Sequence, residues 1–247
     1  MPRLRFDFEW RLTLFVVVAL PIFLALGFWQ LGRADEKRTL AANAAVKDAA
    51  PALAPEELTG LDTDDLSGRK IRVSGSYLPR VFLLDNQIKS GRFGNDVVQL
   101  FRAENNQVYF VNRGWVPADP ARQRPTQIPQ RPTVTAIEGR IYVPPGKPYL
   151  LEPDTLDASS PLVTIQSVDI ESLSTLVIGG SEVFPHLVRL LSDDPTAFDA
   201  SWPVVNISDA KHLGYAIQWF SMAFVLALLF IHRSSNVWAL LRGNNED

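Results

Sequence analysis

Hydrophobic positions are concentrated in two long uncharged runs, one near each end of the chain. The first extends from Leu12 to Gly32 and has 21 residues, and the second extends from Leu213 to Ile231 and has 19. A helix rises about 1.5 Å per residue, so each run is long enough to cross a hydrocarbon core of about 30 Å. The pattern predicts transmembrane helices at 12–32 and 213–231, separated by a domain at 33–211.

The first run also resembles a signal peptide. Three arginines precede it, and the small residues of Ala25-Leu26-Gly27 are typical of a cleavage site. However, the apolar run continues beyond that site to Gly32, and Trp29 suits the aromatic belt of a membrane interface. This continuation favours an uncleaved anchor over a signal peptide.

Two spans place both tails, residues 1–11 and 232–247, on one side of the membrane. Long loops are translocated with little regard to their charge, so the middle segment is the natural exported part. In a mitochondrion the tails would lie in the matrix. We expect the bacterial arrangement, a two-pass protein of the inner (plasma) membrane with cytoplasmic termini and a periplasmic domain.

The middle of the chain has the alternating, β-branched pattern of short strands. Residues 33–50 are rich in helix formers and extend the first helix beyond the membrane. A short helix is predicted at 169–176, and Asn105-Asn106 has the composition of a hairpin turn. Strands are predicted at 71–77, 81–84, 97–101, 108–111, 134–143, 162–166, 183–191 and 204–207.

Two proline-rich stretches, 116–132 and 144–161, predict loops between these strands. The fold class that follows is an α+β membrane protein. Two transmembrane helices flank one β-rich antiparallel domain outside the cytoplasm, and that domain is barrel-like or sandwich-like.

Composition narrows the possible functions. The segment 33–211 carries 19 lysines and arginines against 23 acidic residues, a net charge of −4, so we expect no nucleic-acid partner. The chain has no cysteine, which excludes disulfides, Cys-ligated zinc, iron–sulfur clusters, covalent haem and thiol catalysis. Three scattered histidines and the lack of hydrolase motifs argue against a protein-only metal site and against an enzyme.

The exit of the first run, from Phe28 to Arg33 and at Lys37, has two interpretations. As an anchor, Trp29 lies at headgroup depth while Arg33 and Lys37 reach lipid phosphates. As a recognition patch, Trp29, Gln30 and Arg33 bind a ligand or partner, since Gln30 and Arg33 are three apart on one helix.

The segment Asn112-Arg113-Gly114-Trp115-Val116-Pro117 ends a predicted strand. It is either a strand end with Trp115 packed on the core, or a docking surface. The second interpretation assigns partner binding to Arg113, Gly114 and Trp115, because Arg and Trp are favoured at binding hot spots.

The entrance of the second run places His212, Tyr215 and Trp219 at i, i+3 and i+7, on one helical face. A lone histidine at a membrane interface is commonly a hydrogen-bonding residue of that interface. Alternatively, a neutral imidazole here ligates a haem iron axially, with Trp219 beside the macrocycle.

Together these three motifs resemble the surfeit locus protein 1 family, whose members are assembly factors for cytochrome c oxidase. The resemblance covers the two-span layout from end to end. It is carried by Trp29-Gln30, Arg33 and Lys37, by the segment 112–117, and by Tyr215-Ala216, Gln218, Trp219 and Phe220.

The resemblance implies help in placing haem a into the catalytic subunit of the oxidase. A histidine that leads the second span is implicated in the family, and His212 holds that position. The cofactor site expected for transient, non-covalent haem a is His212, Tyr215, Trp219, Trp29 and Arg33. The partner-binding residues expected are Gln30, Lys37, Arg113, Gly114 and Trp115.

The partners expected are the catalytic subunit, other assembly factors and membrane lipid. The alternative function is a scaffold without cofactor that stabilises an oxidase subunit during assembly.

Overall fold

In the computed structural model, the described residues are 5–144, 146, 154, 156–177, 180–202 and 209–237. The chain divides into two compact units, Met1–Asn43 with Val204–Asp247, and Ala44–Pro203. The predicted strand at 204–207, part of the predicted loop at 144–161 and the outer ends of both predicted tails lie outside the described residues.

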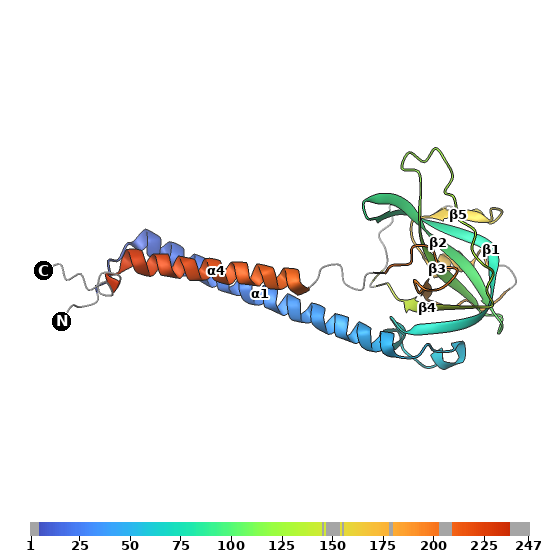
Figure 1. The fold of residues 1–247 in the computed structure, drawn as a ribbon, viewed down its shortest axis with the longest axis horizontal. Coiled ribbons are helices and arrows are strands. Elements are labelled where there is room, and N and C mark those ends of the chain that lie inside the picture. Colours follow the sequence, from blue (N-terminus) through green and yellow to red (C-terminus); the bar gives the residue numbers. More distant parts are fainter. Residues whose placement is uncertain are drawn as a thin grey trace. The chain divides into compact units, whose positions relative to one another are not determined.

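The first unit is a hairpin of two helices, α1 (Trp10–Ala49, whose last turns belong to the second unit) and α4 (Asp209–Ser234). The two helices lie side by side (Figure 1). The start of α1 is joined to the end of α4, because the Asp7 amide donates to the Ser234 carbonyl oxygen at 2.8 Å. Both helices are long and apolar enough to cross a membrane, and they contain the predicted spans.

The contact between α1 and α4 follows a seven-residue period. The less exposed positions include Val16, Phe23, Gln30 and Lys37 on α1, and Asp209, Ala216, Ala223 and Phe230 on α4. This is the period of helices that pack as a left-handed coiled coil. Gly27 lets the helices approach closely, since a Cβ at that position would lie 2.6 Å from the Phe220 ring.

The second unit is built on a six-stranded sheet. Its elements in chain order are η1 (Pro55–Leu58), α2 (Thr63–Leu66), β1 (Lys70–Lys89), β2 (Arg92–Ala103), β3 (Val108–Pro117), β4 (Ala136–Tyr142), β5 (Leu162–Ile165), α3 (Ile170–Ser174) and β6 (Leu187–Leu190). The strand order is β2-β3-β6-β4-β1-β5, and β2 also pairs with β1. Strands β1, β2, β3, β6 and β4 therefore form a closed ring of pairings.

The prediction of two apolar helices around one β-rich domain is confirmed, but the sheet is mixed and not purely antiparallel. The pairs β1–β2, β1–β4, β2–β3 and β4–β6 are antiparallel. The pairs β1–β5 and β3–β6 are parallel. Both parallel strands reach their partners after long connections, which a parallel pair requires and a hairpin does not.

Strand β1 merges the predicted strands 71–77 and 81–84 into one element. Its pairing with β2 shifts register between Tyr77 and Val81, and Pro79 lies in this irregularity, where a missing N–H costs no ladder bond. The hairpin turn at Asn105-Asn106 is confirmed, with Asn106 at φ 67°. The predicted strand at 183–191 is shorter, as β6, and Val183 forms only an isolated bridge to Val108.

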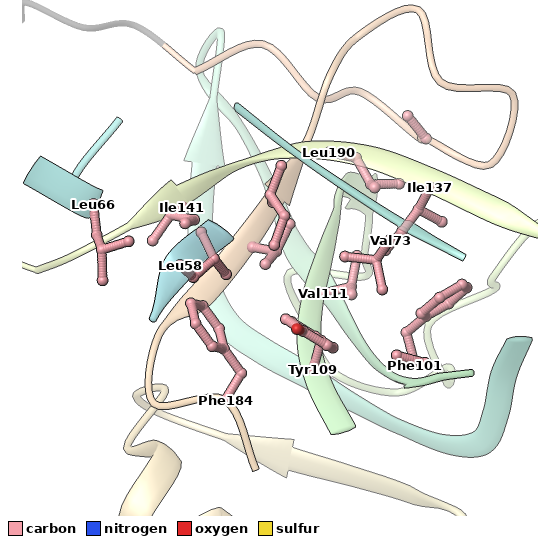
Figure 2. Packing of buried hydrophobic residues seen from close by; sticks show 14 of the residues in the cluster. Leu58, Leu66, Val73, Phe101, Tyr109, Val111, Ile137, Ile141, Phe184 and Leu190 are labelled. Carbon is pink, nitrogen blue, oxygen red and sulfur yellow. The ribbon is translucent and has the colours of Figure 1, made fainter. Parts of the chain in front are cut away.

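Every strand of the ring contributes to one hydrophobic core (Figure 2). Its fully or nearly fully buried members from the strands are Ile71, Val73, Phe101, Tyr109, Val111, Ile137, Ile141, Val188 and Leu190. Burial of each large apolar side chain stabilises the fold by about 1.5–3 kcal/mol. A second core joins the other face of the strands to β5 and α3 through Phe82, Phe110, Ile165 and Leu173.

Candidate functional site

His212 lies in the first turn of α4 and contacts α1 across the hairpin. Its Nδ1 atom is 2.8 Å from Oε1 of Gln30. Both side chains are half-buried, and Gln30 occupies the seven-residue period through which the helices pack. A histidine–glutamine pair thus lies in a seam that is otherwise mainly apolar.

The hydrogen bond between His212 and Gln30 orients the imidazole ring. Oε1 of Gln30 is an acceptor, so Nδ1 of a neutral His212 carries the proton and donates it. Nε2 then keeps its lone pair, which is the form of imidazole that binds a metal ion. Within the described parts of the chain, no three histidine or acidic side chains lie close enough together to hold a metal ion by themselves.

An ion pair lies on the side of the histidine pair away from the apolar runs. Nε of Arg38 on α1 donates to Oδ2 of Asp209 on α4 at 2.9 Å. This hydrogen bond with Arg38 holds the pKa of Asp209 below its ordinary value. Asp209 also lies in the first turn of α4, where a negative charge is favoured by the helix dipole.

The predicted aromatic residues take different places around this pair. Trp219 packs on Phe23 of α1 with ring centroids 5.8 Å apart. Tyr215 and Trp29 are each 54% exposed. The three residues predicted to share one face of α4 therefore differ in their surroundings. His212 and Trp219 lie in the contact with α1, whereas Tyr215 lies outside it.

The basic residues at the exit of the first run lie near this site on α1. Arg33 lies over the Trp29 ring, 5.8 Å from its centroid, and pairs with Glu36 at 2.7 Å. Lys37 is half-buried at a seam position. The partner-binding role predicted for Gln30 and Lys37 stays a prediction, and the pairing of Gln30 with His212 was not among the expectations from the sequence.

The second motif, in β3, is buried inside the domain. Nε and Nη2 of Arg113 donate to the Thr196 carbonyl oxygen at 3.2 and 3.0 Å, and Nη1 donates to Oε1 of Gln99. The guanidinium lies between the rings of Tyr77 and Phe198, 4.5 and 4.9 Å from their centroids. Burial lowers the pKa of Arg113.

Gly114 and Trp115 fix a close contact between β3 and the segment 198–200. Gly114 has φ +105°, and a Cβ there would lie 2.8 Å from the Asp199 carbonyl carbon. Trp115 is 8% exposed, and its Nε1 donates to the Gln87 carbonyl oxygen at 2.9 Å. These contacts match the strand-end alternative, while the docking role of Arg113, Gly114 and Trp115 stays a prediction.

Comparison with known proteins identifies relatives that extend over most of the chain. A model described as the SURF1 family matches residues 17–224. A SURF1-like protein of Rickettsia felis is 25% identical over 240 residues, which cover 92% of this chain and 98% of the relative. A SURF1-like protein of Rickettsia conorii is 25% identical over 228 residues, 87% of this chain and 88% of the relative. Because the family model spans most of the chain and includes both motifs that carry its helical contacts, the chain belongs to the SURF1 family.

Proposed function

We propose that the chain assists the assembly of cytochrome c oxidase, and that His212 holds haem a transiently before the cofactor enters the catalytic subunit. Membership of the SURF1 family and the three motifs support the assembly role. The redox chemistry belongs to haem a in the finished oxidase. The task of this chain is to bind and orient the cofactor without a covalent bond.

The observation that carries the haem proposal is the hydrogen bond between His212 Nδ1 and Gln30 Oε1. Histidines that ligate metals commonly donate their other ring N–H to a second group, which fixes the ring orientation and the tautomer. Gln30 supplies that second group from the facing helix. The pair therefore gives His212 a defined orientation and leaves Nε2 as the nitrogen that would hold the haem iron.

Aromatic and basic residues beside this pair suit the rest of an amphipathic cofactor. Trp29 adjoins Gln30 on α1, and Tyr215 follows His212 by one turn of α4, and both are exposed. Arg33 is the candidate for the propionates, because its present partner Glu36 is about half-exposed. An exposed pair of this kind contributes only about 0–1 kcal/mol, so a propionate can replace Glu36 at little cost.

The location that we propose is the inner membrane of a bacterium, with both tails in the cytoplasm and residues 33–211 in the periplasm. Two apolar helices support a two-pass protein. The hydrogen bond from Asp7 to Ser234 supports tails on one side, because it joins the outer ends of α1 and α4. His212 and Gln30 are then placed toward the periplasmic surface.

The experiment that tests the haem proposal is the optical spectrum of the purified full chain, co-produced with the enzymes of haem a synthesis. We expect a haem a spectrum for the wild type and its loss in His212→Ala. Gln30→Leu should lower occupancy, because the ring loses its orienting acceptor. His232→Ala is the matched control, since His232 lies at the opposite end of the same helix.

Undiminished haem in His212→Ala would exclude the ligand role. Equal loss in His232→Ala would show a general effect on the hairpin. A wild type that carries no haem a but co-purifies with the catalytic subunit would favour the scaffold alternative. A wild type that neither carries haem a nor co-purifies with the catalytic subunit would count against the assembly role itself.

A further inference from the structure

The second unit contains a cavity of about 990 Å³ beside the strand ring. Its walls come from the ring strands β1, β3, β4 and β6 on one side, and from the segment 166–174 on the other. Its size is at the upper end of the range of about 300–1,000 Å³ that is typical of small-molecule sites. It lies wholly within the second unit and shares no residue with the helical hairpin.

Most of the wall is apolar, and one fixed positive charge lies in it. Leu187, Val168 and Ile170 line the cavity with the ring of Tyr142. The charge belongs to Arg189 of β6, whose guanidinium carbon lies over the Tyr142 ring, 3.4 Å from its centroid. The guanidinium is thus held against an aromatic face on the wall.

Arg189 has no carboxylate partner among the described residues, whose ion pairs all involve other side chains. Asp96 attracts it electrostatically, but the carboxylate of Asp96 accepts a hydrogen bond from Asn112 at 2.9 Å. Burial lowers the pKa of Arg189. The rings of Tyr142 and Trp202, 3.4 and 4.9 Å from the guanidinium carbon, offset part of the desolvation cost of this buried guanidinium, and a bound anion would offset more of it.

A second polar group on the same wall is also unpartnered. Ser167 is 7% exposed, and its Oγ is buried without a hydrogen-bond partner among the described residues. Buried hydroxyl groups are almost always hydrogen-bonded in folded proteins. Ser167 and Arg189 therefore both point to a polar ligand group in this cavity.

The other titratable groups on the wall limit the charge of that ligand. Burial lowers the pKa of His186, which is therefore neutral near pH 7. Asp169 and Glu171 are exposed on the segment that forms the opposite wall. A second anionic group on the ligand would meet these carboxylates.

We propose that this cavity binds a small molecule with one carboxylate and a flat apolar body. The carboxylate is bound by Arg189, which favours planar two-oxygen anions, and the body packs on Tyr142 and the aliphatic wall. The assignment does not depend on the oxidase-assembly proposal, because none of its residues belongs to the hairpin.

Isothermal titration of the full chain in lipid nanodiscs tests this assignment, with 2-naphthoate as the probe and empty nanodiscs as the blank. The matched neutral probe is 2-naphthamide, and 2,6-naphthalenedicarboxylate tests the single charge. We expect saturable binding of 2-naphthoate. The amide should bind about tenfold more weakly or worse, because it loses a charge-assisted hydrogen bond. The dicarboxylate should also bind more weakly, because its second carboxylate meets Asp169 and Glu171.

Arg189→Gln should abolish the preference for 2-naphthoate over 2-naphthamide. The matched control is Arg140→Gln, since Arg140 faces Arg189 in the β4–β6 register but does not line the cavity. Val168→Phe, which fills the cavity from its rim, should weaken every probe and serves if Arg189→Gln fails to fold. The assignment would be overturned if no probe bound saturably, or if the amide or the dicarboxylate bound as tightly as 2-naphthoate. It would also be overturned if Arg140→Gln lost the preference as Arg189→Gln does, or if Val168→Phe left binding unchanged.

Discussion

Replacement of Arg113 by methionine should destabilise the second unit. Methionine keeps much of the apolar length of the arginine but cannot donate a hydrogen bond. The Thr196 carbonyl oxygen loses two N–H donors at 3.2 and 3.0 Å, and Oε1 of Gln99 loses its donor from Nη1. Both acceptors then lie in a buried region around β3.

The magnitude follows from these contacts. A buried acceptor left without a donor costs about 1–3 kcal/mol. The lost contacts with the Tyr77 and Phe198 rings add about 0.5–2 kcal/mol each. Release of a buried charge offsets part of this loss, because burial already lowers the pKa of Arg113. We expect a net loss of about 3 kcal/mol.

Thermal unfolding of the full chain in detergent, followed by tryptophan fluorescence, measures this loss. For a unit of this size the melting temperature falls by about 2–4 °C per kcal/mol, so Arg113→Met should melt about 10 °C lower. Arg131→Met is the control, because Arg131 is exposed and lies over the same Phe198 ring at 5.0 Å. Its effect should stay within about 0.5 kcal/mol.

A melting temperature of Arg113→Met within about 2 °C of the wild type would refute the structural role of these hydrogen bonds. If that stable variant also failed to co-purify with the catalytic subunit, the docking interpretation of Arg113 would be favoured.

Four further predictions concern backbone contacts and pH. Gly114→Ala should cost about 1–3 kcal/mol in thermal unfolding, because a Cβ would meet the Asp199 carbonyl carbon at 2.8 Å, and an unchanged melting temperature would contradict this contact. Gly27→Val should make the hairpin easier to unfold in dodecyl sulfate, as measured by circular dichroism. Gly32→Val is the control and should not, because Gly32 has open space around it. Equal unfolding of the two variants would argue against close packing of Gly27 on Phe220. Burial raises the pKa of Tyr77 from 10.0 to about 12, so the contribution of Tyr77 to stability is complete below pH 10 and is lost as the pH rises toward 12. In urea unfolding between these pH values, the free energy of unfolding of Tyr77→Phe should decline less steeply than that of the wild type. Parallel declines would refute the assignment. The hydrogen bond from Arg140 lowers the pKa of Asp48, so the stability that this pair supplies above the ordinary aspartate pKa is lost as the pH falls through the lowered pKa. Acid unfolding of Asp48→Asn should therefore depend less on pH than that of the wild type. An unchanged acid midpoint would contradict this linkage.

The helical hairpin was the part of the fold most open to prediction from the sequence. Uncharged runs of 21 and 19 residues fix two spans by length alone. The order of the strands was not open to prediction in this way. Strand β6 pairs with β3 in parallel, and only a long connection past β4 and β5 brings it there. Alternation identifies a strand but says nothing about a neighbour so distant along the chain.

The sequence suggested residues for the candidate site but not their contacts. Sequence spacing placed His212 on a helical face with Tyr215, whereas packing turns His212 toward Gln30 and leaves Tyr215 exposed. The seven-residue period that passes through Gln30 was the signal that could have indicated the pair. The cavity around Arg189 had no sequence signal, because its walls come from strands and loops far apart along the chain.

The closed ring of pairings has a consequence for the biogenesis of the protein. Strand β6 ends at Leu190 and alone joins β3 to β4, so the ring cannot close until nearly all of the second unit has been synthesised. Until then β3 and β4 each present an unpaired edge, which is a template for aggregation. Because pairings between distant segments also form slowly, this unit should depend on protection during its synthesis and membrane insertion. Destabilised variants are therefore expected to be lost as nascent chains before they can fail as folded proteins.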